Sequence, residues 1–235
     1  MKIQLENKII EFDLIYRKRK TLSILINADG SVKVTAPFRV TKDEILKIIN
    51  SKGEWILKKQ DEIRDINKNK VIRKFENHGV FMYLGSNYTL KLKIMENIKN
   101  ISVELVDNNF IINTNTHNKE KIRYALEKWY REKTLEKAIE RVKYYSRYFN
   151  EYPKEIKSKE QKLRWGSCTY NNKLLFNWRI VMAPIDVFDY IIVHEMCHME
   201  HKNHSKEYWR SVEKILPNYK EEIKWLRENG INISL

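Results

Sequence analysis

Four of the six histidines in this 235-residue chain fall within eleven positions, at His194, His198, His201 and His204. The first two enclose the sequence His-Glu-Met-Cys-His, which is an H-E-x-x-H motif. Side chains at positions i and i+4 of an α-helix lie one above the other, so both imidazoles can bind one Zn²⁺ at about 2.0–2.1 Å. The spacing therefore predicts a helix at residues 194–198 with a metal ion on one face of it.

The residues before the motif favour the same helix. We expect Asp186 to be its N-cap, because a carboxylate there can accept hydrogen bonds from the free N–H groups of the first turn. Val187, Ile191 and Ile192 then recur at a spacing that anchors one helix face in a core. Glu195 lies beside the two histidines and is placed to contact the water on the metal rather than the metal itself.

A catalytic zinc site needs a third protein ligand and leaves the fourth position to water. Asn203 tolerates the left-handed conformation, so it can end the helix and turn His204 back toward the metal. On a continuous helix the Cα of His201 would lie about 10 Å along the axis from that of His194, which is too far for both to bind one small ion. His204 is therefore the expected third ligand. We expect His201 to touch a ligand or the substrate, or to be an exposed residue at the helix end.

Four downstream carboxylates are alternative third ligands, because some H-E-x-x-H enzymes use a glutamate at such a distance. They are Glu207, Glu213, Glu221 and Glu222. Carboxylates are also common on the solvated faces of helices, so these four rank behind His204.

The first half of the chain is rich in short strand-like segments. Apolar runs of strand character lie at residues 8–17, 21–28, 31–37, 80–94, 101–106 and 110–114. Turns are expected at Asp29-Gly30, at Gly85 and at residues 107–109. Residues 41–68 repeat apolar side chains at helical spacing behind Thr41, the expected N-cap, and Gly53 is a point where this helix can kink.

The second half contains more helix. A long amphipathic helix is expected from Asn118 to about Asn150, and two strands at residues 162–168 and 174–181 are joined by a turn. After the histidine helix, further helices are expected around residues 206–215 and from Pro217 to Gly230. No low-complexity linker or short repeat appears. We therefore place a domain boundary near residue 116.

Charge and composition limit the class of protein. Residues 1–115 hold 21 basic and 14 acidic side chains and residues 116–235 hold 24 and 17, so the net charge of +14 is divided equally between the halves. Such a surface favours anionic partners such as nucleotides or nucleic acid, although a Lys- and Asn-rich composition produces the same charge without one.

Only two cysteines occur, Cys168 and Cys197, so a disulfide scaffold or a cysteine-rich zinc site is excluded. The chain has no run of eighteen apolar residues and no signal-peptide pattern at its N-terminus. We therefore expect a cytoplasmic protein without a membrane partner. Nothing in the sequence specifies its oligomeric state.

Four motifs together resemble the YgjP-like family of metal-dependent hydrolases, also called YgjP-like metallopeptidases. They are an R-W-G-S-C strand at Arg164–Cys168, an N-W-R segment at Asn177–Arg179, the histidine helix at Tyr190–His198, and an N-H-S-x-x-Y-W continuation at Asn203–Trp209. The segments Y-R-K-R-K, V-T-A-P and Y-L-G-S-N-Y-T-L-K-L in the first half are also similar to this family, so the likeness spans nearly the whole chain. No Met-turn sequence typical of metzincins follows the motif.

The resemblance implies that His194, His198 and His204 are the zinc ligands and that Glu195 is the general base. It also implies an α+β fold, with a β-rich N-terminal region and a helix over residues 1–115. A zincin-like catalytic domain with a small sheet and the H-E-x-x-H helix would follow over residues 116–235.

The residues around the motif allow a substrate role or a structural one. Arg164 can bind a carboxylate or phosphate of the substrate, or pair with an acid of the protein, while Gly166 can let a substrate backbone approach. Tyr190, one turn before His194, can donate to a developing oxyanion or simply pack as an aromatic residue. Ser167 and Cys168 are not expected to be nucleophiles, because a metal-activated water makes a covalent nucleophile unnecessary.

One further cluster is Arg17-Lys18-Arg19-Lys20, which can bind phosphates or form an exposed charged turn.

These observations predict a zinc-dependent hydrolase of the metallopeptidase type. Glu195 would take a proton from the attacking water and give it to the leaving amine of a peptide. One alternative is a nucleoside triphosphate pyrophosphatase, in which the same water attacks a phosphoanhydride of a nucleotide. Another is a DNA-associated zincin module. The absence of a P-loop and of an Asp-rich magnesium cluster favours amide hydrolysis.

Overall fold

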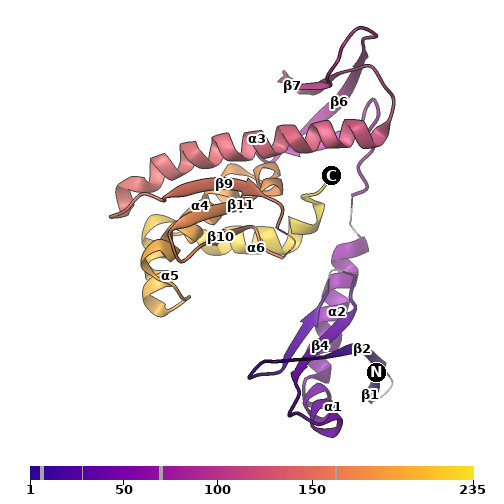
Figure 1. The fold of residues 1–235 in the computed structure, drawn as a ribbon, viewed down its shortest axis with the longest axis vertical. Coiled ribbons are helices and arrows are strands. Elements are labelled where there is room, and N and C mark those ends of the chain that lie inside the picture. Colours follow the sequence, from indigo (N-terminus) through magenta and orange to yellow (C-terminus); the bar gives the residue numbers. More distant parts are fainter. Residues whose placement is uncertain (6–7, 28, 69–70, 162) are drawn as a thin grey trace. The chain divides into compact units, whose positions relative to one another are not determined.

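The computed structural model describes residues 1–5, 8–27, 29–68, 71–161 and 163–235. The chain forms two compact units, Met1–Val71 and Ile72–Leu235 (Figure 1). The boundary between them therefore lies near residue 71 and differs from the boundary that we predicted near residue 116. None of the helices in the described residues is long and apolar enough to cross a membrane.

The N-terminal unit is a four-stranded sheet with two helices. Its strands are β1 (Lys2–Leu5), β2 (Lys8–Arg17), β3 (Ser23–Ile26) and β4 (Val32–Pro37), in the order β1-β2-β4-β3. The central pair β2 and β4 is parallel, and each outer strand is antiparallel to its neighbour. Side chains of the sheet and the helices form a separate core from Ile10, Phe12, Val32, Val34, Ala36, Ile45, Ile49 and Ile56.

The helix expected at residues 41–68 is divided into α1 (Lys42–Ser51) and α2 (Gly53–Lys68). Thr41 is the N-cap, as predicted, and forms a reciprocal capping box with Glu44. The chain bends at Lys52, and a Cβ on the following Gly53 would lie only 2.7 Å from Cδ2 of Leu5. A larger residue at position 53 would therefore require the Leu5 side chain to shift.

The second unit begins with a sheet of the same topology. Its strands are β5 (Val80–Tyr83), β6 (Ser86–Ile94), β7 (Ser102–Val106) and β8 (Asn109–Thr114), in the order β5-β6-β8-β7. The central pair is again parallel and the outer pairs are antiparallel. The chain thus builds one architecture twice, although no repeat is visible in its sequence.

The long helix α3 (Lys119–Tyr145) explains why this second sheet belongs to the C-terminal unit. The ring of Phe110 on β8 lies 4.9 Å from that of Trp129 on α3, in an edge-to-face contact. Phe81, Leu90 and Phe110 thereby share one core with the helix and with everything that follows it. A boundary near residue 116 would cut through this core.

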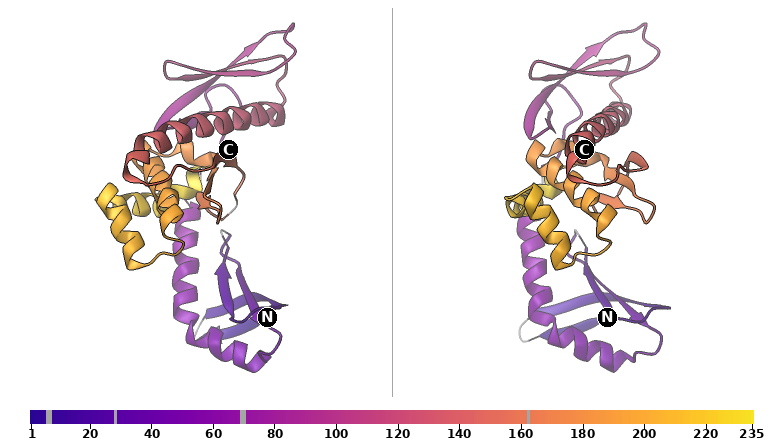
Figure 2. Two further views of the ribbon diagram at one scale, coloured as in Figure 1. Left: turned by 60° about the vertical axis from the view of Figure 1, so that its left-hand side comes forward. Right: turned by 90° about the vertical axis from the view of Figure 1, so that its left-hand side faces the viewer.

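Beyond α3 comes a three-stranded sheet of β9 (Glu155–Lys159), β10 (Gly166–Cys168) and β11 (Lys173–Asn177), in the order β10-β11-β9. In the ribbon, α3 lies between this sheet and the β5–β8 sheet (Figures 1 and 2). The strand expected to continue to Val181 ends at Asn177, whose side chain accepts from the Arg179 N–H and starts a 3₁₀ helix at Trp178–Met182.

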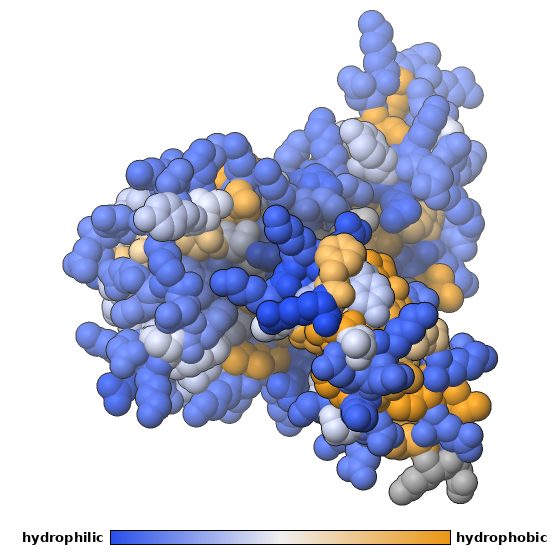
Figure 3. Space-filling view, turned by 60° about the horizontal axis from the view of Figure 1, so that its bottom comes forward, coloured by the Kyte–Doolittle hydropathy of each residue, from blue (hydrophilic) through white to orange (hydrophobic). Residues whose placement is uncertain are grey.

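Three helices complete the unit: α4 (Ile185–Glu200), α5 (Lys206–Ile215) and α6 (Tyr219–Asn229). Short 3₁₀ turns follow α3 at Ser146–Tyr148 and α6 at Gly230–Asn232. The fold is a mixed α+β fold consistent with a zincin-like domain, as predicted. Hydrophilic residues cover most of the face drawn in Figure 3, and hydrophobic ones gather mainly toward its lower right.

The N-cap predicted for α4 is wrong. The N–H of Phe188 donates to the carbonyl of Pro184, so the helix has already begun before Asp186. Pro184 is the N-cap residue, and Asp186 lies in the first turn, where its charge interacts favourably with the helix dipole. The predicted anchors Val187, Ile191 and Ile192 are buried.

Candidate metal centre

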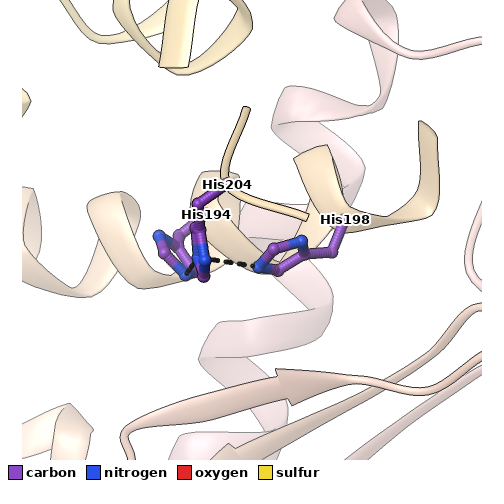
Figure 4. Close-up of side chains that lie close together, drawn as sticks. All are labelled: His194, His198 and His204. Atoms are coloured by element: carbon purple, nitrogen blue, oxygen red, sulfur yellow. Dashed lines mark hydrogen bonds between the residues drawn. The ribbon is translucent and has the colours of Figure 1, made fainter. Parts of the chain in front are cut away.

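Three histidines converge at the C-terminal end of α4. The Nε2 atom of His204 lies 3.1 Å from Nε2 of His198 and 3.2 Å from Nε2 of His194 (Figure 4). Nitrogen atoms bound to one tetrahedral Zn²⁺ at 2.0–2.1 Å are about 3.3 Å apart. Both distances are close to this value, and the ligand atoms of all three imidazoles lie within 4.8 Å of one another, so the three rings are placed to share a single metal ion.

The protonation of these rings also suits a ligand. Burial, helped by the charges of His198 and His204, lowers the pKa of His194 to about 3. Burial lowers the pKa of His198 as well, against the opposing effect of a hydrogen bond to the backbone of His201. Because a metal binds the neutral imidazole, these rings can take a cation without first losing a proton at neutral pH.

Hydrogen bonds on the far side of each ring hold the histidines of α4 in place. Nδ1 of His198 lies 2.9 Å from the carbonyl oxygen of His201, and Nδ1 of His194 lies 3.3 Å from Oη of Tyr190. A metal on Nε2 leaves the ring proton on Nδ1, where it can be donated to these oxygens. Tyr190 thus contacts the back of a candidate ligand, and its hydroxyl is not directed at an open site.

The turn that returns His204 differs from the prediction. Helix α4 ends at Glu200, and His201 is the C-cap with φ −118° and ψ 104°. Asn203 is not among the described residues with positive φ, so the helix does not end through a left-handed asparagine. The extended backbone at His201 already turns the chain out of the helix.

The side chain of His201 points elsewhere. Its Nε2 lies 3.2 Å from Oγ of Ser211 on α5, whereas its carbonyl oxygen faces His198. His201 therefore contributes to the candidate site through its backbone carbonyl. A backbone contact of this kind cannot be predicted from the type of side chain.

Two aromatic residues of α5 support the histidines, and neither was predicted to have a role. The Tyr208 hydroxyl donates to the carbonyl of His194 at 3.0 Å, and its ring stacks on His198 with centroids 4.6 Å apart. Trp209 stacks on His204 at 5.6 Å and 23°. The sequence did contain a signal for this support: the two residues follow His204 by four and five positions, on the first turn of a capped helix.

Glu195 lies beside this cluster with 4% of its surface exposed. Burial raises the pKa of its carboxyl to about 8, against smaller lowering effects of the Cys168 N–H and the charge of Arg164. The Cys168 N–H bonds to the carboxylate, but Oε2 has no hydrogen-bond partner within the described protein. A buried carboxylate oxygen without a partner is what a metal-activated water would satisfy.

Gly166 on β10 makes room for this carboxylate. A Cβ at Gly166 would lie 2.6 Å from Cγ and 2.7 Å from Oε1 of Glu195. The approach of Glu195 thus accounts for the glycine, which we had linked to the substrate backbone.

Arg164 is exposed, and among the described residues it forms no ion pair with an acid. Its charge is close enough to lower the pKa of Glu195, and its carbonyl accepts from Nδ2 of Asn177 at 3.2 Å. The structural alternative, in which Arg164 pairs with an acid of the protein, is not observed in this part of the chain.

The neighbouring thiol is poorly suited to be a nucleophile. Burial raises the pKa of Cys168, and its Sγ contacts the Thr169 carbonyl at 3.4 Å. Thiols attack as thiolates, so a raised pKa weakens this one.

The downstream glutamates lie outside the cluster. Across the described ranges, the only group of three or more His, Cys, Asp or Glu side chains with ligand atoms within 4.8 Å of one another is His194, His198 and His204. Glu213, for example, lies 3.8 Å from Lys220. Geometry therefore brings together the three predicted histidines and none of the alternative carboxylates.

Comparison with known proteins gives one family and one solved structure. The model of the family described as "YgjP-like, metallopeptidase domain" matches residues 20–229. No curated protein shows significant similarity to the chain. A crystal structure of the metallopeptidase zymogen abylysin from Pyrococcus abyssi is 21% identical, covering 44% of this chain and 98% of that one, with a TM-score of 0.33.

Proposed function

The chain belongs to the YgjP-like metallopeptidase family, and we propose that it is a zinc-dependent hydrolase that cleaves amide bonds in peptides. The observation that carries the proposal is the convergence of three Nε2 atoms beside a buried carboxylate with one unpaired oxygen.

His194, His198 and His204 would hold the metal. Imidazole nitrogens suit zinc, and a site with three of them leaves one coordination position open, as in catalytic rather than structural sites. When bound, zinc lowers the pKa of a water molecule and polarises the carbonyl group that this water attacks.

Glu195 would move the proton. Because the Cys168 N–H already bonds to the carboxylate, one oxygen is held in place while Oε2 stays free. Burial raises the pKa of this carboxyl, but a cation held by the three histidines would favour its ionised form. Oε2 would then accept a proton from the attacking water, and Glu195 would deliver it to the nitrogen of the leaving amine.

The edge of β10 supports a peptide as the substrate. Asn177 N–H donates to the Trp165 carbonyl and Thr169 N–H donates to that of Lys173, so positions 165 and 169 face β11. By the alternation of an antiparallel pair, the N–H and carbonyl groups of Gly166 point away from β11. An extended peptide can pair with such an edge, and the exposed Arg164 next to it can bind a carboxylate of the substrate.

Parallel assays test this proposal. The purified chain, loaded with zinc or stripped by a chelator, would be incubated with casein and with a panel of nucleoside triphosphates. We expect casein cleavage that requires zinc and is lost in Glu195→Gln. Zinc-dependent hydrolysis of a nucleotide without cleavage of casein would contradict the proposal and favour a pyrophosphatase.

A further inference from the structure

One end of the N-terminal sheet gathers cations from two separate segments. Strands β2 and β4 are parallel and end in register, with Arg17 opposite Pro37, so the residues that follow them emerge at the same edge. Nη2 of Arg39 donates to the Lys20 carbonyl at 3.1 Å across this edge. We call the group Tyr16, Arg17, Lys18, Arg19, Lys20, Phe38 and Arg39 the basic tip.

The cations of the basic tip lack acidic partners. Elsewhere in the same unit basic side chains pair with acids, as in Lys2–Glu11 and Lys8–Asp61. Within the described residues, none of the five cations of the tip forms an ion pair, and all five are exposed. The acids closest in sequence are Asp13 on β2 and, in the first turn of α1, Asp43 and Glu44, of which Glu44 is bonded to Thr41. Uncompensated positive charge at one spot attracts a polyanion.

An exposed aromatic ring lies among these charges. Phe38 is 72% exposed, and its ring is stacked on that of Tyr16 with centroids 6.2 Å apart and planes 16° from parallel. Burial is normally favourable for a phenylalanine side chain, yet Phe38 is not part of the core of this unit. The tip therefore combines an exposed apolar ring with cations that are next to Tyr16 and Phe38 in the sequence.

The fold itself does not require this composition. At the equivalent corner of the second sheet, β6 and β8 end with Ile94 opposite Thr114, and Nδ2 of Asn115 donates to the Ile98 carbonyl at 3.0 Å. In the second sheet this bond occupies the position that the bond from Arg39 to the Lys20 carbonyl has in the first sheet. The loop after β6 carries one acid and one base, Glu96 and Lys99, whereas the loop after β2 carries three cations, Lys18, Arg19 and Lys20.

We propose that the basic tip binds single-stranded nucleic acid. Its cations would contact backbone phosphates while a base stacks on Phe38, which is the combination that single-strand binding proteins use. A duplex hides the faces of its bases, so stacking favours the single strand. This function goes beyond the hydrolase and does not rest on the metal centre.

The test uses the full chain and fluorescein-labelled (dT)₁₂, (U)₁₂ and a 12-base-pair duplex, followed by fluorescence anisotropy at several salt concentrations. The variant Arg17→Glu/Lys18→Glu removes two cations of the tip. The matched control, Lys47→Glu/Lys58→Glu, makes the same charge change at exposed residues of α1 and α2. We expect binding of the single strands to weaken at least 10-fold in the tip variant and less than about 2-fold in the control. The slope of log K against log salt should fall by about 0.7 for each lost phosphate contact.

A second variant isolates the stacking. Phe38→Ala should weaken single-strand binding about 5-fold to 100-fold, and Phe38→Trp should retain it. Glu195→Gln should bind as the wild type does, since the tip acts independently of the hydrolase. Circular dichroism would verify that each variant is folded.

Three results would overturn the proposal. They are equal binding by the tip variant and its control, equal affinity for the duplex and the single strands, and tip-dependent binding to phosphatidylserine vesicles without binding to either oligonucleotide.

Discussion

The chain forms the same four-stranded sheet twice, and the two copies differ in what packs on them. The sheet β1–β4 packs on α1 and α2 and forms a core with them. The sheet β5–β8 packs on α3 and shares its core with the helix that carries the histidines. Strand order alone therefore does not determine what a sheet contributes to the protein. Its contribution depends on the helices that cover it and on the side chains at the ends of its strands.

Helix α3 links the second sheet to the metal centre. Oγ1 of Thr134 donates to the Trp178 carbonyl at 2.7 Å, which fixes the segment leading into α4. Arg141 binds Asp189 of α4 through two hydrogen bonds of 2.6 and 2.5 Å. The second sheet is therefore part of the scaffold of the site, whereas the core of the first sheet is separate from the one that contains α4.

The largest expected effect is that of Glu195→Gln, which should abolish most hydrolysis without changing oligonucleotide binding. Glu195→Gln keeps the size and most hydrogen-bonding capacity of the side chain but removes the proton acceptor, so hydrolysis should fall by about 10²–10⁴-fold. Oligonucleotide binding by the tip should stay within 2-fold of the wild type. Peptide turnover and anisotropy measured on the same preparation check both statements. Normal turnover in this variant would show that Glu195 is not the base.

A second variant should destabilise only the C-terminal unit. Asp189→Ala leaves Arg141 without its partner in a pair whose side chains are 19% and 7% exposed, and such a loss typically costs about 3–5 kcal/mol. Glu136→Ala on α3 breaks an exposed pair with Lys133 and should cost less than about 1 kcal/mol. Urea titration followed by hydrogen exchange reports each unit separately. Equal loss of protection in residues 1–71 would mean that the two cores unfold together.

The smallest expected effect lies in the N-terminal unit. Thr41→Ala removes the hydrogen bond that the Thr41 hydroxyl accepts from the Glu44 N–H, although the N–H of residue 41 can still donate to Glu44. This loss should destabilise the unit by about 0.5–2 kcal/mol. Ser51→Ala at the other end of α1 is a control with an exposed hydroxyl. Zinc content and hydrolysis should not change in either variant. A drop in hydrolysis with Thr41→Ala would couple the first sheet to the metal centre and weaken the contrast between the two sheets.

The sequence was informative where short-range spacing decides structure. The i, i+4 histidines predicted their helix, Asp29-Gly30 predicted the turn between β3 and β4, and the capping box at Thr41 is present. Each of these signals depends on residues within one or two turns of chain, whose conformations are set by local sterics and hydrogen bonds.

Long-range features were missed for a physical reason. The repeated sheet depends on parallel pairing between β2 and β4 and between β6 and β8, which are not consecutive strands and leave no local pattern. The support of His198 by a backbone carbonyl, and the need for Gly166 beside Glu195, arise from tertiary contacts. The candidate ligands and the candidate base were visible in the sequence, but these tertiary contacts around them were not.

Metal analysis of two histidine variants tests the three-histidine centre most directly. Zinc per chain would be measured by mass spectrometry after dialysis for the wild type, His204→Ala and His201→Ala. The second variant is a matched control, because His201 acts through its carbonyl and its ring faces Ser211. A centre of His194, His198 and His204 predicts one zinc in the wild type and in His201→Ala, and loss of zinc in His204→Ala. Full zinc in His204→Ala, or its loss in His201→Ala, would contradict this set of ligands.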